Sequence, residues 1–279
     1  MISLAALGND LYSGKTSLPF IAKRRIWYTI AIVVIALSAV LVVKPGLNPG
    51  IDFKGGSEVT VTGVADPSEG PGNDVLADKD LSSGSSVTTM GASSVRIQTN
   101  ELDKAQLDEL ASSLATAYDV DSGSVSATTI GPTWSADVTS KAARGLVIFF
   151  LLVGALIWIY FRTWKMAAAA LLALSHDIIV TIGIYAASGF EVTPATIIGV
   201  LTILGYSLYD TVVVFDKIRE NTSHYEAQTR STYAELANLA VNQTFIRSIN
   251  TSVVGVLPVA SLLVVGAFIL GAGTLRDIA

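Results

Sequence analysis

Long apolar segments alternate with polar ones along this chain, and their lengths predict membrane-spanning helices. Residues 26–43 carry no charged side chain, and a run of about 18–20 apolar residues is long enough to cross the hydrocarbon core of a bilayer. Four further apolar segments follow after a polar insert. We therefore predict a polytopic α-helical membrane protein with five spans, at about 26–43, 145–161, 166–187, 194–215 and 248–270.

The distribution of basic residues predicts the orientation of these spans. Residues 23–25 are all basic, and basic side chains recur at 162–165 and in the polar loop 216–247. Because basic loops are retained in the cytoplasm, we expect the leader 1–25 and the amino terminus to be cytoplasmic. Five spans then leave the carboxyl terminus outside, so we expect a sixth span that this chain lacks. A signal peptide is the competing interpretation of 26–43, but that run is longer than a typical h-region and further spans follow.

The polar insert, residues 44–141, has the pattern of a small folded domain outside the cytoplasm. Asn100 is a suitable N-cap for a helix over 101–118, whose leucines lie near one face. Residues 67–86 predict a loop with one short helix. Alternating or β-rich segments predict strands at 57–62, 95–99 and 124–130. Strands interspersed with helices in so short an insert predict a ferredoxin-like α+β layer, with helices on one face of the sheet.

Composition supports the membrane assignment and excludes several kinds of site. Hydrophobic residues make up 51% of the chain and charged residues 15%, and the mean hydropathy is +0.56. The absence of cysteine excludes disulfides and thiolate metal sites, and two histidines, His176 and His224, are too few for a histidine-rich metal centre. The net charge of −5 gives no indication of nucleic-acid binding. We expect no enzyme activity and no cofactor other than the proton.

One predicted span carries an aspartate, Asp210, among apolar residues. A carboxylate inside a membrane-spanning helix is costly and is a functional-site candidate by default. Thr202 and Tyr206 precede Asp210 at four-residue steps and lie on the same helix face. Arg247 opens the last span at a similar depth, with Asn250 and Thr251 one turn further along. Adjacent helices would bring Arg247 to Asp210, and such a pair offsets much of the cost of both charges.

A second aspartate, Asp177, lies near the middle of its span, and the sequence identifies no partner for it. His176 is turned about 100° away on a helix, which argues against a His–Asp dyad. Two interpretations of the polar residues remain open. They are either fixed contacts that hold the bundle together, or a proton relay in which protonation of Asp210 releases Arg247 and changes the preferred helix packing.

Several motifs resemble a known family. Gly50–Gly56 reads Gly-Ile-Asp-Phe-Lys-Gly-Gly, which is similar to the signature of SecD and SecF, with Asp52, Phe53, Gly55 and Gly56 at its defining positions. Four further segments resemble SecF in particular: Ser175-His-Asp177, Gly205-Tyr-Ser-Leu-Tyr-Asp210-Thr, Phe215-Asp-Lys-Ile-Arg219-Glu-Asn221 and Arg247-Ser-Ile-Asn-Thr251-Ser. The resemblance extends from about residue 20 to 279.

The resemblance implies a bacterial plasma-membrane subunit that associates with SecD and with the SecYEG channel. In that family, proton movement powers a late stage of preprotein export, and the essential aspartate and arginine fall on Asp210 and Arg247. Two departures stand out: the absent sixth span, and Ser135, where the family commonly has glycine. The residues around Asp52 form either a turn between the first span and the sheet or a hinge that transmits motion.

Three other functions are alternatives to a proton-coupled export subunit. Two aspartates on consecutive spans superficially fit an intramembrane aspartyl protease, but neither lies in a Gly-x-Gly-Asp sequence, and pairing with arginine would keep Asp210 ionised. A secondary transporter for small solutes would need a second half and a larger outer domain. A non-translocating scaffold would use the charges only for structure.

Overall fold

The computed structural model describes residues 4–91, 93–223, 225 and 230–269. It divides into two compact units. The first contains the residues up to Gly46 together with Val147–Gly189 and Val200–Leu257, and the second contains Leu47–Leu146, Phe190–Gly199 and the residues from Pro258. Within the described residues, five helical stretches are long and apolar enough to cross a membrane, as the hydrophobic pattern predicts. They are α2 (Arg24–Val43), α6 (Pro132–Phe161), α7 (Trp164–Ser188), α8 (Pro194–Thr222) and α9 (Tyr233–Ser261), the last continued by the π-helix η3 (Leu262–Ile269).

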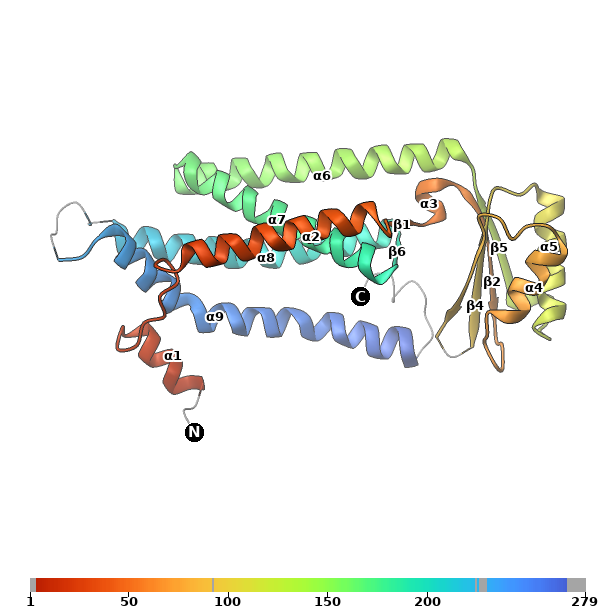
Figure 1. Cartoon of the computed structure of the whole chain (residues 1–279), viewed down its shortest axis with the longest axis horizontal. Coiled ribbons are helices and arrows are strands. Elements are labelled where there is room, and N and C mark those ends of the chain that lie inside the picture. The colour runs from red at the N-terminus through yellow and green to blue at the C-terminus, as the bar shows by residue number, and fades with distance from the viewer. Residues whose placement is uncertain (1–3, 92, 224, 226–229, 270–279) are drawn as a thin grey trace. The chain divides into compact units, whose positions relative to one another are not determined.

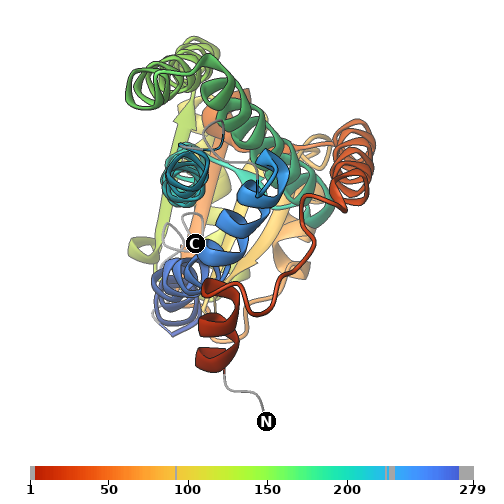
Figure 2. The same cartoon turned by 90° about the vertical axis from the view of Figure 1, so that its left-hand side faces the viewer.

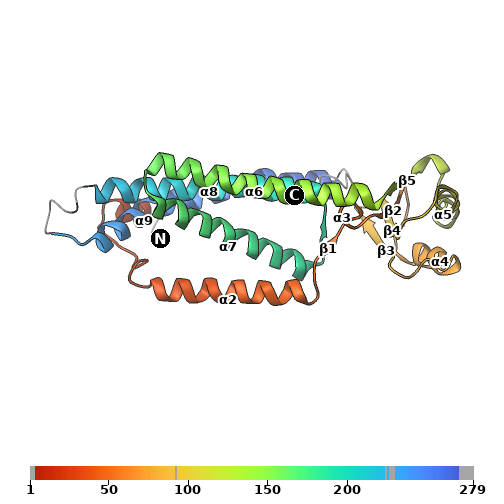
Figure 3. The same ribbon diagram turned by 90° about the horizontal axis from the view of Figure 1, so that it is seen from above.

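In the first unit, α2 packs along α7, as the labelled view in Figure 3 and the green and orange-red helices of Figure 2 show. A Cβ atom on Gly183 would clash with Ser38 of α2. The missing side chain at Gly183 therefore permits the close approach, as small residues commonly do between membrane helices.

Helices α6, α7 and α8 share an apolar cluster. Its buried members include Val153 and Phe161 of α6, Ala170 and Leu174 of α7, and Leu204 of α8. Most other large apolar side chains of the spans are exposed. An exposed apolar exterior is expected of helices that contact lipid or a partner subunit.

The segment before α2 is ordered against α9. It includes the short helix α1 (Leu4–Tyr12), which lies within the predicted leader. Asn242 is 1% exposed, accepts a hydrogen bond from the Leu18 amide at 2.8 Å and donates one to the Leu18 carbonyl at 3.0 Å. Asn238 accepts a further bond from the Ile21 amide at 3.0 Å. Two asparagines one turn apart therefore fix an otherwise irregular segment.

The second unit contains a four-stranded sheet with strand order β3-β4-β2-β5, and all neighbouring strands are antiparallel. Its elements are β2 (Gly56–Thr62), α4 (Gly70–Asp78), β3 (Ser86–Met90), β4 (Ser94–Thr99), α5 (Lys104–Ala117), the short 3₁₀ turn η1 (Ser122–Ser124) and β5 (Val125–Ile130). The order β-α-β-β-α-β is that of a ferredoxin-like layer. Helices α4 and α5 cover the same face of the sheet (Figure 1), which confirms the predicted fold class.

The core of this layer follows the period-two pattern of its strands. Val59, Val61, Val95 and Ile97 are fully buried and pack against the leucines of α5. Because successive strand residues point to opposite faces, the intervening polar residues of β2 and β4 lie on the face opposite α4 and α5. This polar face contains the ion-pair network described below.

Several predicted boundaries are wrong. The N-cap of α5 is Asp103, not Asn100, because Asp103 and Gln106 form a capping box. Strand β3, which was not predicted, begins at Ser86, the last residue of the predicted loop 67–86. Helix α6 begins at Pro132, earlier than the predicted start of its span at 145, and the two compact units divide inside it, between Leu146 and Val147, close to the predicted boundary at 141/142. Ser135, where the family has glycine, is buried in the first turn of this helix and donates to the Pro132 carbonyl at 3.0 Å.

The predicted loop 216–247 is largely helical, since α8 continues to Thr222 and α9 begins at Tyr233. Thr232 and Glu235 supply reciprocal hydrogen bonds at the start of α9, a helix-start signal that the sequence already contains. His224 and residues 270–279, which include the end of the predicted last span, lie outside the described residues.

Candidate functional site

Asp210 lies on α8 and is partly buried. Its Oδ1 is buried and has no hydrogen-bond partner among the described residues. Tyr206, one turn earlier, has its ring in ordinary contact range of Gly255 on α9, where an added Cβ would be 3.7 Å away. Thr202 is exposed, as is Tyr206. A buried carboxylate oxygen without a donor is unusual in a folded protein and calls for a functional or structural reason.

Arg247 does not bind Asp210 among the described residues, contrary to the predicted pair. Its Nη2 donates a hydrogen bond to the Tyr209 hydroxyl at 2.8 Å, and its guanidinium lies 5.8 Å from the centre of the Tyr209 ring. Tyr209 precedes Asp210 by one position, which turns it about 100° around the helix. The prediction considered only the depth of the two charges, whereas the rotation of α8 and α9 determines which side chain Arg247 meets.

The residues that follow Arg247 on α9 were predicted to extend its polar face. Thr251 is partly buried and Asn250 is exposed. Neither side chain has a hydrogen bond to a described residue. The structure therefore places both residues one turn from Arg247 but does not connect them to Asp210.

Asp177 has two side-chain partners that the sequence did not reveal. Ser207 of α8 donates a hydrogen bond from its hydroxyl to Asp177 Oδ2 at 2.5 Å. His176 Nδ1 lies 3.3 Å from Asp177 Oδ1, so the expectation that these neighbours would not interact is wrong. Side-chain rotation bridges the 100° between consecutive helix positions. The hydroxyl of Thr181, one turn further along α7, donates to the Asp177 backbone carbonyl at 2.8 Å.

An open pocket of about 270 Å³ adjoins this aspartate. Its polar lining comes from His176, Asp177, Thr181 and Ser207, and apolar residues of α7 and α8 complete it. A volume of this size, with several polar groups, is sufficient for water molecules. Water beside Asp177 would give a proton access to the carboxylate. Ser207, three residues before Asp210, is the functional candidate that the sequence analysis missed, although its polarity beside an intramembrane aspartate was a usable signal.

The signature after the first span forms a compact helical turn. Helix α3 (Ile51–Lys54) carries Asp52 and the partly buried Phe53 and ends at Gly55, which has a φ of +78°. Gly56 has a φ of +136°, and a Cβ there would lie 2.5 Å from the Thr99 carbonyl oxygen. Gly56 combines a positive φ with a close approach to β4, so no residue with a side chain fits there, whereas Gly55 is favoured by its positive φ and by the Ile130 carbonyl oxygen of β5, 3.3 Å from where its Cβ would lie.

Asp52 lies in an acidic environment outside the spans. Burial raises the pKa of its carboxyl group above the ordinary value of 3.8, and the negative charges of Glu58 and Glu191 raise it further, whereas Arg96 acts in the opposite direction. Asp52 therefore binds a proton more readily than an ordinary aspartate does.

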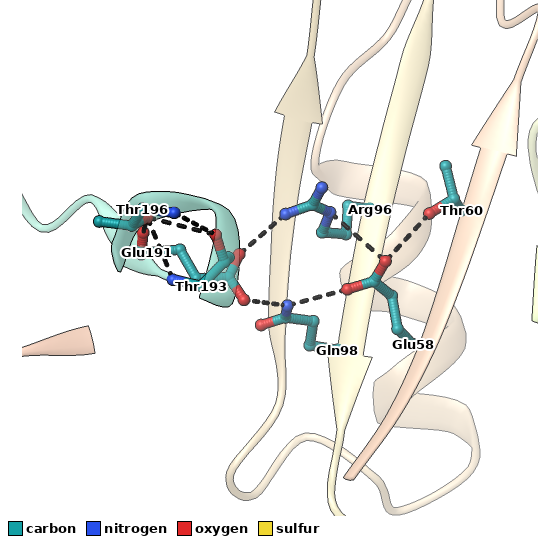
Figure 4. A network of polar contacts seen from close by, with 7 residues as sticks. All are labelled: Glu58, Thr60, Arg96, Gln98, Glu191, Thr193 and Thr196. Carbon is teal, nitrogen blue, oxygen red and sulfur yellow. Dashed lines mark hydrogen bonds and ion pairs between the residues drawn. The ribbon is translucent and has the colours of Figure 1, made fainter. Parts of the chain in front are cut away.

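The charged side chains that act on Asp52 belong to a polar network within the second unit (Figure 4). Glu191 belongs to the two-residue strand β6 (Glu191–Val192), which pairs in parallel with β1 (Asn48–Pro49). Arg96 Nη1 donates to Glu191 Oε2 at 2.8 Å, and Gln98 Nε2 donates to Glu191 Oε1 at 2.6 Å. Gln98 also donates to Glu58 Oε2 at 3.0 Å. Glu191 lies between the predicted spans 166–187 and 194–215, and no local pattern in the sequence identifies a partner so distant in the chain.

The described residues include no group of three histidine, cysteine, aspartate or glutamate side chains that would hold a metal ion. The ionisable side chains of the candidate site are Asp177 on α7, Asp210 on α8 and Arg247 on α9.

Spans with intramembrane charges and a ferredoxin-like insert after the first span define a polytopic membrane protein with an α+β domain. The chain matches the family described as protein export membrane protein SecD/SecF, C-terminal, over residues 110–279, and the SecD/SecF GG motif over residues 40–63. The chain belongs to the SecD/SecF family of protein-export membrane proteins, and it resembles the SecF members at full chain length.

Relatives include the protein translocase subunits SecF of Streptomyces coelicolor, 44% identical, and Mycobacterium tuberculosis, 41% identical. The alignments cover 100% and 96% of this chain and 74% and 63% of those proteins. Among solved structures, SecDF of Thermus thermophilus, described as a translocon-associated membrane protein, matches with a TM-score of 0.80 at 28% identity. That match covers 94% of this chain and 36% of the SecDF chain.

Proposed function

We propose that this chain is a proton-coupled subunit of a SecD–SecF complex that assists a late stage of preprotein translocation through the SecYEG channel. The relatives named translocase subunits support the role in translocation. A SecDF protein of Thermus thermophilus, 36% identical over 54% of this chain, supports SecD as the partner, since its name joins both subunits. The chain performs no covalent catalysis in this proposal, and the proton is its coupling ion.

The observation that carries the proposal is the buried Oδ1 of Asp210, which has no hydrogen-bond partner among the described residues, while Arg247 of α9 binds the neighbouring Tyr209. An ionised aspartate in this position would attract Arg247, whereas a protonated one would not. The arrangement with Arg247 on Tyr209 is therefore the one that protonated Asp210 favours. Loss of the proton would draw Arg247 from Tyr209 toward Asp210 and change the contact between α8 and α9.

The energy available to one proton is sufficient for such a switch. Moving one charge through the membrane potential releases about 2.3 kcal/mol per 100 mV. Each pH unit of gradient adds about 1.4 kcal/mol. A two-state packing equilibrium can therefore be shifted by more than about tenfold per proton.

Asp177 and Ser207 extend the relay to α7. Their hydrogen bond joins α7 to α8 beside a pocket that is large enough for water. A proton that reaches Asp177 would weaken its acceptance of the Ser207 bond and loosen this contact. Protonation of Asp177 would thus change the contact of α8 with α7, and protonation of Asp210 would change the contact of α8 with α9.

We further propose that the amino terminus is cytoplasmic and that the α+β domain lies on the opposite side of a bacterial plasma membrane. The basic residues 23–25 and 162–165 support this orientation. In this orientation the domain would meet the preprotein as it leaves the channel.

The protease alternative lacks support from the geometry. A protease dyad requires two carboxyl groups that share a proton. Asp177 bonds to Ser207 and His176, and Asp210 Oδ1 has no partner among the described residues. The two aspartates thus form no dyad in the described part of the chain.

The proposal is tested by Asp210→Asn in the full-length protein, in cells depleted of the endogenous subunit. Asparagine preserves the shape but cannot titrate. Pulse–chase labelling of a secreted preprotein should show export as slow as in cells without the subunit. Asp216→Asn, an exposed aspartate further along α8, is the matched control and should export normally. If Asp210→Asn is present in the membrane at the normal level and export is normal, Asp210 does not couple export to protons. Only a scaffold role would then be left.

A further inference from the structure

The connection between α7 and α8 belongs to the same compact unit as the sheet. Residues Phe190–Gly199 cluster with the α+β domain, although α7 before them and the rest of α8 after them belong to the first unit. Within this connection, β6 pairs with β1, and the Gly50 amide donates to the Val192 carbonyl at 2.9 Å. The chain itself therefore runs from Asp177 on α7, through the domain, to Ser207 and Asp210 on α8.

Glu191 makes the principal side-chain contacts of this connection with the sheet. Both of its carboxylate oxygens are used, one by Arg96 at 2.8 Å and the other by Gln98 at 2.6 Å. The side chains of Arg96 and Glu191 are only 15% and 17% exposed. Removal of one partner from a largely buried charge pair leaves the other uncompensated, which is strongly unfavourable. The contact is therefore held far more firmly than a surface ion pair.

The two partners of Glu191 are themselves fixed in the sheet. Gln98 lies directly across from Glu58 in the β2–β4 register, and Gln98 Nε2 donates to it. Arg96 Nε lies 3.6 Å from Glu58 Oε1. Arg96 and Gln98 thus bridge two carboxylates, one from the sheet and one from the connection (Figure 4).

The start of α8 is bonded to the Glu191 segment as well. Thr193 and Thr196 exchange reciprocal bonds between backbone amide and hydroxyl, each at 3.2 Å. Thr196 also donates to the Glu191 carbonyl at 3.4 Å. Both threonines are buried. This arrangement caps the first turn of α8 by satisfying the Thr196 amide, and the bond from Thr196 to the Glu191 carbonyl means that a displacement of α8 along its axis would act directly on Glu191.

The signature turn is shaped to accept Glu191. A Cβ on Gly50 would lie 2.7 Å from Glu191 Oε1 and 3.2 Å from the Val192 carbonyl oxygen. The absence of a side chain at Gly50 therefore leaves room for the carboxylate between the turn and the sheet. The turn, the connection and β4 meet at this one side chain.

We propose that Glu191 is the positioning residue that couples α7 and α8 to the outer sheet through Arg96 and Gln98. A proton-dependent change in α7 and α8 is passed through this contact to the α+β domain. The inference rests on the proposed function, because it requires a proton-driven change in those helices. It adds the residue by which that change reaches the domain outside the membrane.

The test uses the full-length protein in its complex with SecD, reconstituted in proteoliposomes. A pH gradient is imposed, and hydrogen exchange is followed by mass spectrometry in peptides from α7 and α8 and from β2 and β4. The variants are Glu191→Ala, which removes both acceptors, and Glu191→Gln, which keeps one. Glu69→Ala, an exposed glutamate of the same unit, is the matched control.

In the wild type and in Glu69→Ala, the gradient should change exchange in both sets of peptides. In Glu191→Ala the change should persist in α7 and α8 and be lost in β2 and β4, with Glu191→Gln intermediate. A merely structural role would alter exchange without a gradient but leave the gradient response of the sheet intact. Exchange without a gradient also shows whether each variant is folded, and Glu191→Gln carries the test if Glu191→Ala is not.

Two outcomes would overturn the inference, and only the second of them would also contradict the proposed function. If the sheet responds fully to the gradient in folded Glu191 variants, the coupling role of Glu191 is wrong while the proposed function stands. If the wild type shows no gradient response in α7 and α8, the proposed function itself is wrong, and the coupling role is lost with it.

Discussion

The Ser207 hydroxyl donates a 2.5 Å hydrogen bond to Asp177 Oδ2 and thereby joins α8 to α7. A hydrogen bond to a charged group contributes about 1.5–3 kcal/mol. Ser207→Ala should therefore slow preprotein export, whereas Ser207→Thr, which keeps the hydroxyl, should not. Pulse–chase labelling of a secreted preprotein measures both. Ser252→Ala is the control, because that hydroxyl bonds to the Ser248 carbonyl of its own helix and to no other of the described residues. Equal export by all three variants would show that the bond plays no part in the relay.

The contact between Arg247 and Tyr209 predicts how removal of the Tyr209 hydroxyl group affects export. Tyr209→Phe keeps the ring beneath the guanidinium but removes the acceptor of the 2.8 Å bond. Arg247 should then favour Asp210, so export should slow and become more dependent on the size of the proton gradient. Export driven by gradients of different size measures this. Tyr28→Phe, at an exposed position of α2, should behave as the wild type, and identical behaviour of Tyr209→Phe would exclude a partner change by Arg247.

Asn242 anchors the segment that precedes α2. Its replacement by alanine removes the partly buried bond from the Leu18 amide, and a hydrogen bond of this kind contributes about 0.5–1.5 kcal/mol. Asn242→Ala should therefore free this segment locally and accelerate trypsin cleavage after Lys15 and Lys23 in membranes. The exposed Asn250→Ala is the control and should be cleaved at the wild-type rate. Unchanged cleavage of Asn242→Ala would show that α9 does not hold the segment.

Gly56 tests the physical basis of the glycine signature. A Cβ at this position meets the Thr99 carbonyl oxygen at 2.5 Å, and the φ of +136° is itself unfavourable for other residues. Gly56→Ala should destabilise the sheet by about 2 kcal/mol or more. Faster hydrogen exchange in β2 and β4 of the full chain would report this. Gly70→Ala, where an added Cβ has open space, should leave exchange unchanged, and the hypothesis is wrong if both variants behave alike.

The raised pKa of Asp52 predicts a pH dependence of stability. A raised pKa in the folded state means that folding favours the protonated form, so the stabilising contribution is present below the ordinary value of 3.8. It is lost as the pH rises through the folded pKa. Asp52→Asn should therefore raise the unfolding temperature of the full chain at neutral pH and have less effect in acid. Thermal unfolding at several pH values measures this, with Asp66→Asn, an exposed aspartate of the same unit, as control. A uniform effect across pH would contradict it.

The sequence by itself determined the spans and the fold class, because both depend on local patterns. Runs of apolar residues identify membrane helices whatever their neighbours, and period-two alternation identified β2 and β4. The cost of a charge inside a span identified Asp177 and Asp210 without knowledge of any partner. The strand β3 was missed because its short, polar pattern resembles a loop.

The partners of these charges were determined only by the tertiary structure. Arg96 and Glu191 lie 95 positions apart in the chain, and no periodicity relates residues at such a distance. Arg247 meets Tyr209 and not Asp210 because helix rotation, which sequence depth does not specify, selects between neighbours about 100° apart. Hydrophobic burial is non-directional and can be predicted from composition and period. Hydrogen bonds and ion pairs are directional and short, so their partners depend on how the helices and strands pack.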